Sequence, residues 1–342
     1  MNKEIEIIYK SYASGTIDLN TFVEAMAEYK DVEPSQEEVD EIYTTDLLRK
    51  DVERVDTGLV TGYSYLDNFI RIPVSALTII AGRPSHGKTT MLMNIMMRMI
   101  MNYSDKKFFF FSYEEPQSQI ALKLINLIAS EVLSEYSNVR AIQGYVKNGF
   151  SDNSNINNAM KVYDQLAKNR NVSIYAKSYD VEELCVKIRQ LVEEHDVGAI
   201  FIDYIQKIRT KRNFNSRQLE VQYVSNEILK VAKDCGIAII LGCQLGRGGQ
   251  NAHKIRLDNM RESGDIEQDA NLVLAIFNPT MEKEHEAYQN GVQTQYERCV
   301  PFRVTILKNR DGVVGNEIFL EFDRPLNKIV NPKIGVQNES ND

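Results

Sequence analysis

The fold of this chain is decided by the segment GRPSHGKT at residues 82–89, which fits the pattern G-x-x-x-x-G-K-[ST]. An apolar run at residues 77–81 leads into this segment, and a helical stretch at residues 89–101 follows it. The two glycines allow backbone N–H groups to wrap around phosphate oxygens, and the start of a helix adds its positive dipole end. We therefore predict a phosphate-binding loop, in which Lys88 neutralises phosphate charge and the Thr89 hydroxyl holds Mg²⁺.

The loop and the first helical turn form the predicted nucleotide site. His86 falls at a variable position of the pattern, so we expect it to be a packing or surface residue. The residues assigned to nucleotide binding are Gly82, Arg83, Ser85, Gly87, Lys88, Thr89 and Thr90.

Strands and helices alternate from residue 57 onward, which predicts an α/β domain with a mainly parallel sheet. The last two strands flank the turn residues Asp311 and Gly312, so the sheet should end in an antiparallel hairpin. Helices are expected at residues 89–101, 117–130, 181–194 and 218–235. Strands are expected at residues 77–81, 107–112, 172–176, 198–203, 237–242, 272–277, 303–307 and 317–322.

Changes in pattern along the chain predict three parts. Residues 1–56 form a small α-helical N-terminal region, in which the capping-box pattern of Thr21 and Glu24 predicts a helix start. This region is too short to bury a core of its own, so we expect it to pack on the main domain or on another subunit. Residues 57–330 form the main domain, and residues 331–342 form a polar tail.

Three predicted strands end in polar residues on the side of the sheet where α/β proteins bind ligands. Asp203 ends an apolar strand and can hold Mg²⁺ through water. Glu114 and Glu115 follow another strand, and one of them could polarise a water molecule as a general base, although acids at a helix start are also common for electrostatic reasons. Gln244 ends a third strand and could contact the γ-phosphate or the water.

Local basic segments must carry any attraction to nucleic acid, because the formal net charge of the chain is −8. Residues 207–217 hold five positive charges and no negative one, directly after a predicted strand. A second loop, residues 246–264, contains Arg247, Lys254 and Arg261 among glycines and polar residues. Both segments predict contacts with a phosphate backbone, although ordinary solvated loops can have the same composition.

The composition excludes several other classes of protein. The apolar runs fall short of the ~20 residues that cross a bilayer, and the charged start does not resemble a signal peptide. The four cysteines and four histidines lack the spacing of metal ligands. We expect a cytoplasmic protein with no membrane partner. That it belongs to a bacterial cell, or to a phage or plasmid within one, is implied only by the resemblance given below.

Taken together, these motifs resemble the motor domain of DnaB-type replicative helicases, of the RecA-like superfamily, over roughly residues 57–322. The most specific match is MRESGDIEQDA at residues 260–270. The phosphate loop, SYEE at residues 112–115 and KNRDG at residues 308–312 also match. The resemblance implies a RecA-like P-loop NTPase core that uses ATP and Mg²⁺.

The same resemblance assigns roles to single residues. It implies that Glu114 is the catalytic glutamate, that Gln244 is a sensor, and that Arg310, with Lys308, reaches the γ-phosphate in the neighbouring subunit. The catalytic set is Lys88, Glu114, Asp203, Gln244, Arg310 and Lys308, with Thr89 and Asp203 as Mg²⁺ ligands. The DNA-binding set is Lys211, Arg212, Arg217, Arg247, Lys254, Arg261, Glu262 and Gly264.

The function implied by the resemblance is that of an ATP-dependent replicative DNA helicase. Such a protein would form a homo-oligomeric, hexameric ring, translocate on single-stranded DNA and unwind the duplex at a replication fork. Residues 36–50 would form a linker helix, and primase or a helicase loader would be partners. Two alternatives stay open: a RecA-like strand-exchange ATPase, and an ATP-dependent DNA-binding accessory protein that does not unwind.

Overall fold

The computed structural model describes residues 58–132, 139–148, 154–246 and 266–332, together with scattered positions between residues 7 and 25. The chain divides into two compact units, Met1–Asp56 and Thr57–Asp342. The predicted linker helix at residues 36–50 lies outside the described residues.

A helix cap is described in the first unit, and it differs from the predicted one. Asp18 Oδ1 accepts a hydrogen bond of 2.8 Å from the backbone N–H of Thr21, and Asn20 and Thr21 are already helical. The expectation that Thr21 caps this helix is therefore wrong. The helix begins earlier than predicted, and its N-cap aspartate accepts from the N–H three residues later.

The second unit is built on one sheet, which has nine strands among the described residues, in the order β3-β2-β4-β5-β1-β6-β7-β8-β9. The strands from β3 to β6 in this order, β1 and β2 included, all run parallel to their neighbours. Strands β7, β8 and β9 each pair antiparallel with the strand before them in this order. The predicted α/β class and the C-terminal antiparallel hairpin are thus confirmed. The strands are β1 Ala76–Gly82, β2 Lys107–Ser112, β3 Val172–Tyr175, β4 Val197–Asp203, β5 Ala238–Gln244, β6 Leu272–Phe277, β7 Cys299–Asn309, β8 Glu317–Asp323 and β9 Lys328–Val330.

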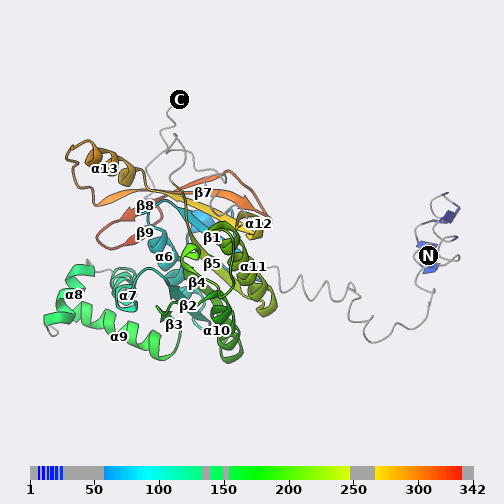
Figure 1. Ribbon diagram of the computed structural model, residues 1–342, viewed down its shortest axis with the longest axis horizontal. Coiled ribbons are helices and arrows are strands. Elements are labelled where there is room, and N and C mark those ends of the chain that lie inside the picture. The colour runs from blue at the N-terminus through cyan, green and yellow to red at the C-terminus, as the bar shows by residue number, and fades with distance from the viewer. Residues whose placement is uncertain are drawn as a thin grey trace. The chain divides into compact units, whose positions relative to one another are not determined.

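Helices cover both faces of the sheet because successive side chains of each buried strand point to opposite faces. In β2, Phe108 and Phe110 join one apolar cluster, with side chains from α6, α7, α8 and α9. Phe109 and Phe111 join the other cluster, with side chains from α10 and α11. Figure 1 shows α7, α8 and α9 on one side of the sheet and α10 and α11 on the other.

The described helices extend the predicted set. None of those searched is both long enough and apolar enough to span a bilayer. The α-helices are α5 Ser64–Asp67, α6 Lys88–Asn102, α7 Gln117–Val132, α8 Val139–Asn148, α9 Ser154–Lys168, α10 Val181–Glu194, α11 Arg217–Cys235, α12 Ile266–Asp269 and α13 Pro279–Gln289, and Ile205–Lys207 forms the 3-10 helix η1.

One buried side chain connects helix α6 to the turn between β8 and β9. Asn94 Nδ2 donates to the backbone oxygens of Thr90 and Asn327, at 2.8 and 2.9 Å. Its Oδ1 accepts a bond of 2.9 Å from the backbone N–H of Ile329. The antiparallel end of the sheet is therefore held against the helix that follows the phosphate loop.

We predict that Asn94→Ala lowers the free energy of unfolding by about 2–4 kcal/mol, because it leaves buried backbone groups of Asn327 and Ile329 without partners. Urea unfolding followed by circular dichroism measures this. The control is Asn102→Ala, at the exposed end of the same helix, which should cost less than about 0.5 kcal/mol. Equal losses in the two variants would contradict the bridging role.

Candidate functional site

The predicted site lies at one edge of the sheet, where the parallel strands end. Gly82 at the end of β1 pairs with Gln244 at the end of β5. Ser112 at the end of β2 pairs with Asp203 at the end of β4. The phosphate loop, Asp203, Gln244 and the acids after Ser112 therefore meet at the carboxyl edge, as α/β ligand sites require.

The phosphate loop exposes backbone N–H groups at the start of α6. Ser85 and Gly87 have positive φ angles of 65° and 92°. Gly87 is the N-cap of α6, and no side chain caps this helix end. The first N–H groups of the helix are thus available to an anion, and the helix dipole favours one there.

Asp203 and Thr89 form a buried pair that fits a magnesium site. The Thr89 hydroxyl donates to Asp203 Oδ2 at 2.5 Å. The other oxygen, Asp203 Oδ1, is buried and has no hydrogen-bond partner among the described residues. Burial raises the pKa of Asp203, and the bond from Thr89 and the charge of Lys88 oppose that rise. A divalent cation would satisfy the orphaned oxygen and stabilise the carboxylate form.

Space beside this carboxylate depends on Gly242 in β5. A Cβ at this position would lie 2.9 Å from Asp203 Oδ1. Within the described part of the chain, no group of three or more His, Cys, Asp or Glu side chains could hold a metal. The ion would therefore take its other ligands from phosphate oxygens and water, which is the usual arrangement for Mg²⁺.

The ammonium group of Lys88 is placed to bind an anion. Its side chain is buried, and Nζ lies 3.5 Å from the backbone oxygen of Arg83. Burial lowers the pKa of Lys88, and the nearby carboxylates of Asp203 and Glu114 oppose that fall. A phosphate group beside Nζ would stabilise the ammonium form.

The two acids that follow β2 have different environments. Glu115 accepts a hydrogen bond of 2.6 Å from Lys123 Nζ, so its charge is already paired. Glu114 is exposed, makes no hydrogen bond or ion pair within the described residues, and acts electrostatically on Lys88 and Asp203. Its position therefore suits a base that faces the phosphate loop better than that of Glu115 does.

Gln244 is positioned by a second glutamine that the sequence analysis gave no separate role. Gln206 Nε2 donates to the backbone oxygen of Gln244 at 3.0 Å, and Gln206 Oε1 accepts from the backbone N–H of Gln244 at 3.1 Å. This pair of bonds links η1, directly after the Asp203 strand, to the end of β5. The ends of β4 and β5 are thus also linked by hydrogen bonds outside the sheet.

Lys308 and Arg310 lie at the opposite edge of the sheet. Asn309, at the end of β7, pairs with Leu272 at the start of β6, and β6 runs parallel to β1. Lys308 Nζ donates to the backbone oxygens of Glu267 and Gln268, at 2.6 and 3.2 Å. The exposed Arg310 donates to Gln268 O at 2.9 Å. These two side chains are therefore not brought together with the phosphate loop of the same chain.

Two other predicted nucleotide contacts point to protein partners. Arg83 Nη1 lies 2.7 Å from Glu282 Oε1 in α13. The Thr90 hydroxyl donates to Asn327 Oδ1 at 2.9 Å, which leaves the backbone of Thr90 as the part available to a ligand. His86, expected to pack or to lie on the surface, is buried at 5% exposure.

Several side chains of the basic segment at residues 207–217 pair with acidic side chains. Lys211 Nζ lies 3.1 Å from Asp180 Oδ2 and 3.5 Å from Glu183 Oε1. Arg217 pairs with Glu220 at 2.5 Å and donates to the backbone oxygen of Ile208 at 2.9 Å.

Arg212 lies over the ring of Tyr223, 4.6 Å from its centroid. Lys211, Arg212 and Arg217 thus have partners within the protein, and their contact with DNA stays a prediction. Arg247, Lys254, Arg261, Glu262 and Gly264 lie outside the described residues.

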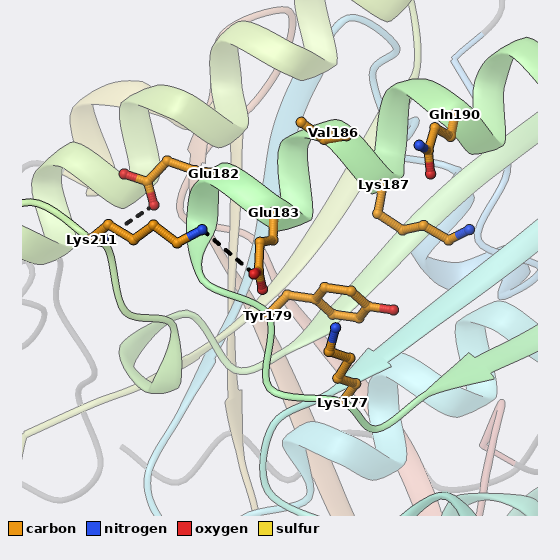
Figure 2. Close-up of a pocket in the computed structure, with 8 residues that line it drawn as sticks. All are labelled: Lys177, Tyr179, Glu182, Glu183, Val186, Lys187, Gln190 and Lys211. Atoms are coloured by element: carbon orange, nitrogen blue, oxygen red, sulfur yellow. Dashed lines mark hydrogen bonds and ion pairs between the residues drawn. The ribbon is translucent and has the colours of Figure 1, made fainter.

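A pocket of about 360 Å³ lies away from the phosphate loop, at the start of α10 (Figure 2). Figure 2 shows the backbone N–H of Lys211 bonded to Glu182, Lys211 Nζ close to Glu183, and Lys177 beside the ring of Tyr179. Since no residue of the phosphate loop lines this pocket, we assign no nucleotide to it. The lining residues are Lys177, Tyr179, Glu182, Glu183, Val186, Lys187, Gln190 and Lys211.

Comparison with known proteins supports the same interpretation of the main domain. Residues 58–331 match the family of the DnaB-like helicase C-terminal domain. The replicative DNA helicase DnaB of Helicobacter pylori (strain ATCC 700392 / 26695) is 27% identical over 80% of this chain and 59% of its own length. DnaB of Buchnera aphidicola subsp. Baizongia pistaciae is 31% identical over 76% of this chain and 52% of its own length. The chain thus spans less than two thirds of these curated relatives.

Solved structures share the fold. One of them, described as an ATPase domain, superposes with a TM-score of 0.68 at 23% identity, over 88% of this chain and all of that domain. A DnaB-like replicative helicase, described with its interactions with primase, has a TM-score of 0.68 at 22% identity, over 97% of this chain and 76% of that one. The main domain therefore shares its fold with these two proteins.

We predict that Glu114→Gln lowers the rate of ATP hydrolysis by about 10²–10⁴-fold, because it removes the base and leaves the phosphate loop unchanged. Binding of a fluorescent ATP analogue should be retained. Glu115→Gln, which only breaks the ion pair with Lys123, should stay within about fivefold of the unaltered protein. A larger loss in Glu115→Gln than in Glu114→Gln would reverse the assignment.

Proposed function

This chain belongs to the family of the DnaB-like helicase C-terminal domain, and we propose that it is an ATP-dependent replicative DNA helicase. Its subunits form a homo-oligomeric ring, with a hexamer as the expected state. Single-stranded DNA at a fork is the substrate on which it translocates, and ATP with Mg²⁺ supplies the free energy. Its similarity to bacterial replicative helicases supports activity in the cytoplasm.

The observation that carries this proposal is the division of the catalytic residues between two edges of one sheet. Lys88, Thr89 and Asp203 lie at the carboxyl edge. Lys308 and Arg310 lie at the amino edge of the parallel strands, away from the phosphate loop of the same chain, and in this proposal they meet the nucleotide of another subunit. An ATP site shared by two copies couples hydrolysis to the relative position of neighbours, as a translocating ring requires.

In the proposed mechanism, the α6 N-terminus and Lys88 hold the β- and γ-phosphates, and Mg²⁺ would bind Thr89 and Asp203 and neutralise developing charge. Glu114 accepts a proton from the attacking water. Gln244 faces the same edge and transmits the loss of the γ-phosphate to the loop after β5. Arg310 and Lys308 of the adjacent copy stabilise charge in the transition state.

We propose that DNA is held mainly by the loop that follows β5. Lys211 and Arg217 are engaged in ion pairs. In the loop, the resemblance gives Arg261, Glu262 and Gly264 a role in DNA contact, and Arg247 and Lys254 add positive charge. Several phosphates would be neutralised together, so the affinity should fall steeply with salt. Primase is a proposed partner because a DnaB-like helicase with the same fold is described with its interactions with primase.

The function is tested by strand displacement on forked DNA that carries either a 5′ or a 3′ tail. The protein should displace the strand only with ATP, and Lys88→Ala should show no displacement, because each base-pair step costs about 1.4 kcal/mol to open. ATP hydrolysis stimulated by DNA without displacement would indicate an accessory protein. Filaments in place of rings in electron micrographs would indicate a strand-exchange ATPase.

We predict that Arg310→Ala lowers the hydrolysis rate by roughly 10³-fold while the dissociation constant for ATP stays nearly unchanged. Mixing this variant with Lys88→Ala should restore part of the activity, because a boundary between the two variants can contain one intact site. The control is Arg189→Ala on α10, which removes an exposed arginine from the surface. Hydrolysis by Arg310→Ala at the rate of this control would exclude a shared site.

A further inference from the structure

A carboxylate in α13 binds two side chains of the phosphate loop. Glu282 Oε1 accepts from Arg83 Nη1 at 2.7 Å, and Oε2 lies 3.1 Å from His86 Nε2. The side chains of Arg83 and Glu282 are each 17% exposed, and that of His86 is 5% exposed. Each oxygen of one carboxylate thus holds one residue of the loop in a largely buried position.

The second ring nitrogen of His86 fixes its tautomer. Nδ1 accepts a hydrogen bond of 3.2 Å from the backbone N–H of Asn278, so Nδ1 carries the lone pair. Nε2 then carries the proton and donates to Glu282, with the imidazole neutral. Asn278 Oδ1 also caps α13 by accepting from Met281 N at 3.1 Å. The start of α13 and the loop are therefore linked at two points, through Asn278 and through Glu282.

The loop conformation needs such support. His86 lies between Ser85 and Gly87, which both have positive φ angles. A serine in this region of φ/ψ space is strained and persists only where surrounding contacts determine it. The bonds from Arg83 and His86 to Glu282 hold the residues on both sides of Ser85.

We infer that Glu282 is a positioning residue that preorganises the phosphate loop for a nucleoside triphosphate. This inference rests on the proposed function, in that the loop must bind ATP. Glu282 acts through Arg83 and His86 and not through the nucleotide. A carboxylate this close to the loop would by itself repel a triphosphate, so a positioning role and a purely electrostatic role predict opposite effects of its removal.

The size of the effect follows from the fraction of molecules whose loop is competent to bind. The apparent dissociation constant is the intrinsic one divided by that fraction. If the loop is competent in nearly all molecules of the unaltered protein and in about 0.1–0.3 of the Glu282→Ala molecules, the Kd and KM for ATP rise about 3–10-fold. The kcat should change less than about twofold, because the competent loop is unchanged once ATP is bound.

The experiment measures the Kd of a fluorescent ATP analogue and the KM and kcat for ATP in Glu282→Ala, with Glu286→Ala as the matched control. Glu286 is exposed on the same helix, and its side chain makes no hydrogen bond or ion pair within the described residues. Glu282→Gln should give an intermediate rise, since its amide oxygen can accept from only one of the two donors. Hydrogen exchange of the amides of residues 83–88 should become faster in the same order.

A double-mutant cycle with His86→Ala completes the test. Because both groups belong to one clamp, the double variant should raise the Kd little more than Glu282→Ala alone. A Kd for Glu282→Ala equal to that of the control, or tighter, would overturn the inference, as would additive effects in the cycle. Failure of the unaltered protein to bind ATP would instead overturn the proposed function. If Glu282→Ala does not fold, Glu282→Gln against Glu286→Gln decides by the same criteria.

Discussion

The hydrogen bond from the Thr89 hydroxyl to Asp203 is the interaction on which the site depends. It joins the first turn of α6 to the end of β4, and it occupies one carboxylate oxygen while the other stays buried without a partner among the described residues. Burial of that oxygen is possible because Gly242 in the adjacent strand has no side chain. The apolar strands around this oxygen exclude water, so its burial without a partner costs free energy. A bound cation would offset that cost.

Most of the sheet could be predicted because its strands are short apolar runs between turn residues, and these runs identify buried strands locally. The helices α8, α9 and α13 and the strand β9 were not predicted. Strand β9 has three residues, and its pairing with β8 is a tertiary contact that no short pattern marks. The polar helix α13 buries none of its side chains, so it lacks the apolar stripe by which a helix is usually recognised.

The site was predictable where its chemistry is contained in a contiguous motif, and less so where it depends on contacts across the fold. The phosphate loop is such a motif. The residue types alone did not distinguish Glu114 from Glu115. The difference is the hydrogen bond that Lys123, in the following helix α7, donates to Glu115. The ion-pair partner of Lys211 precedes it by about thirty residues, and the contact of Glu282 with the loop spans nearly two hundred, so no short pattern marks either contact.

The placement of the β7–β8 hairpin determines how many complete ATP sites the proposed assembly contains. On the proposed assembly, an isolated copy of the chain holds every part of a hydrolytic centre and yet possesses no complete one, since Arg310 and Lys308 serve a neighbour. A closed ring then has as many working centres as subunits, and an opened ring has one fewer. The boundary that opens to admit a DNA strand would then hydrolyse no ATP, because its site is incomplete, and no inhibitor or switch would be needed there.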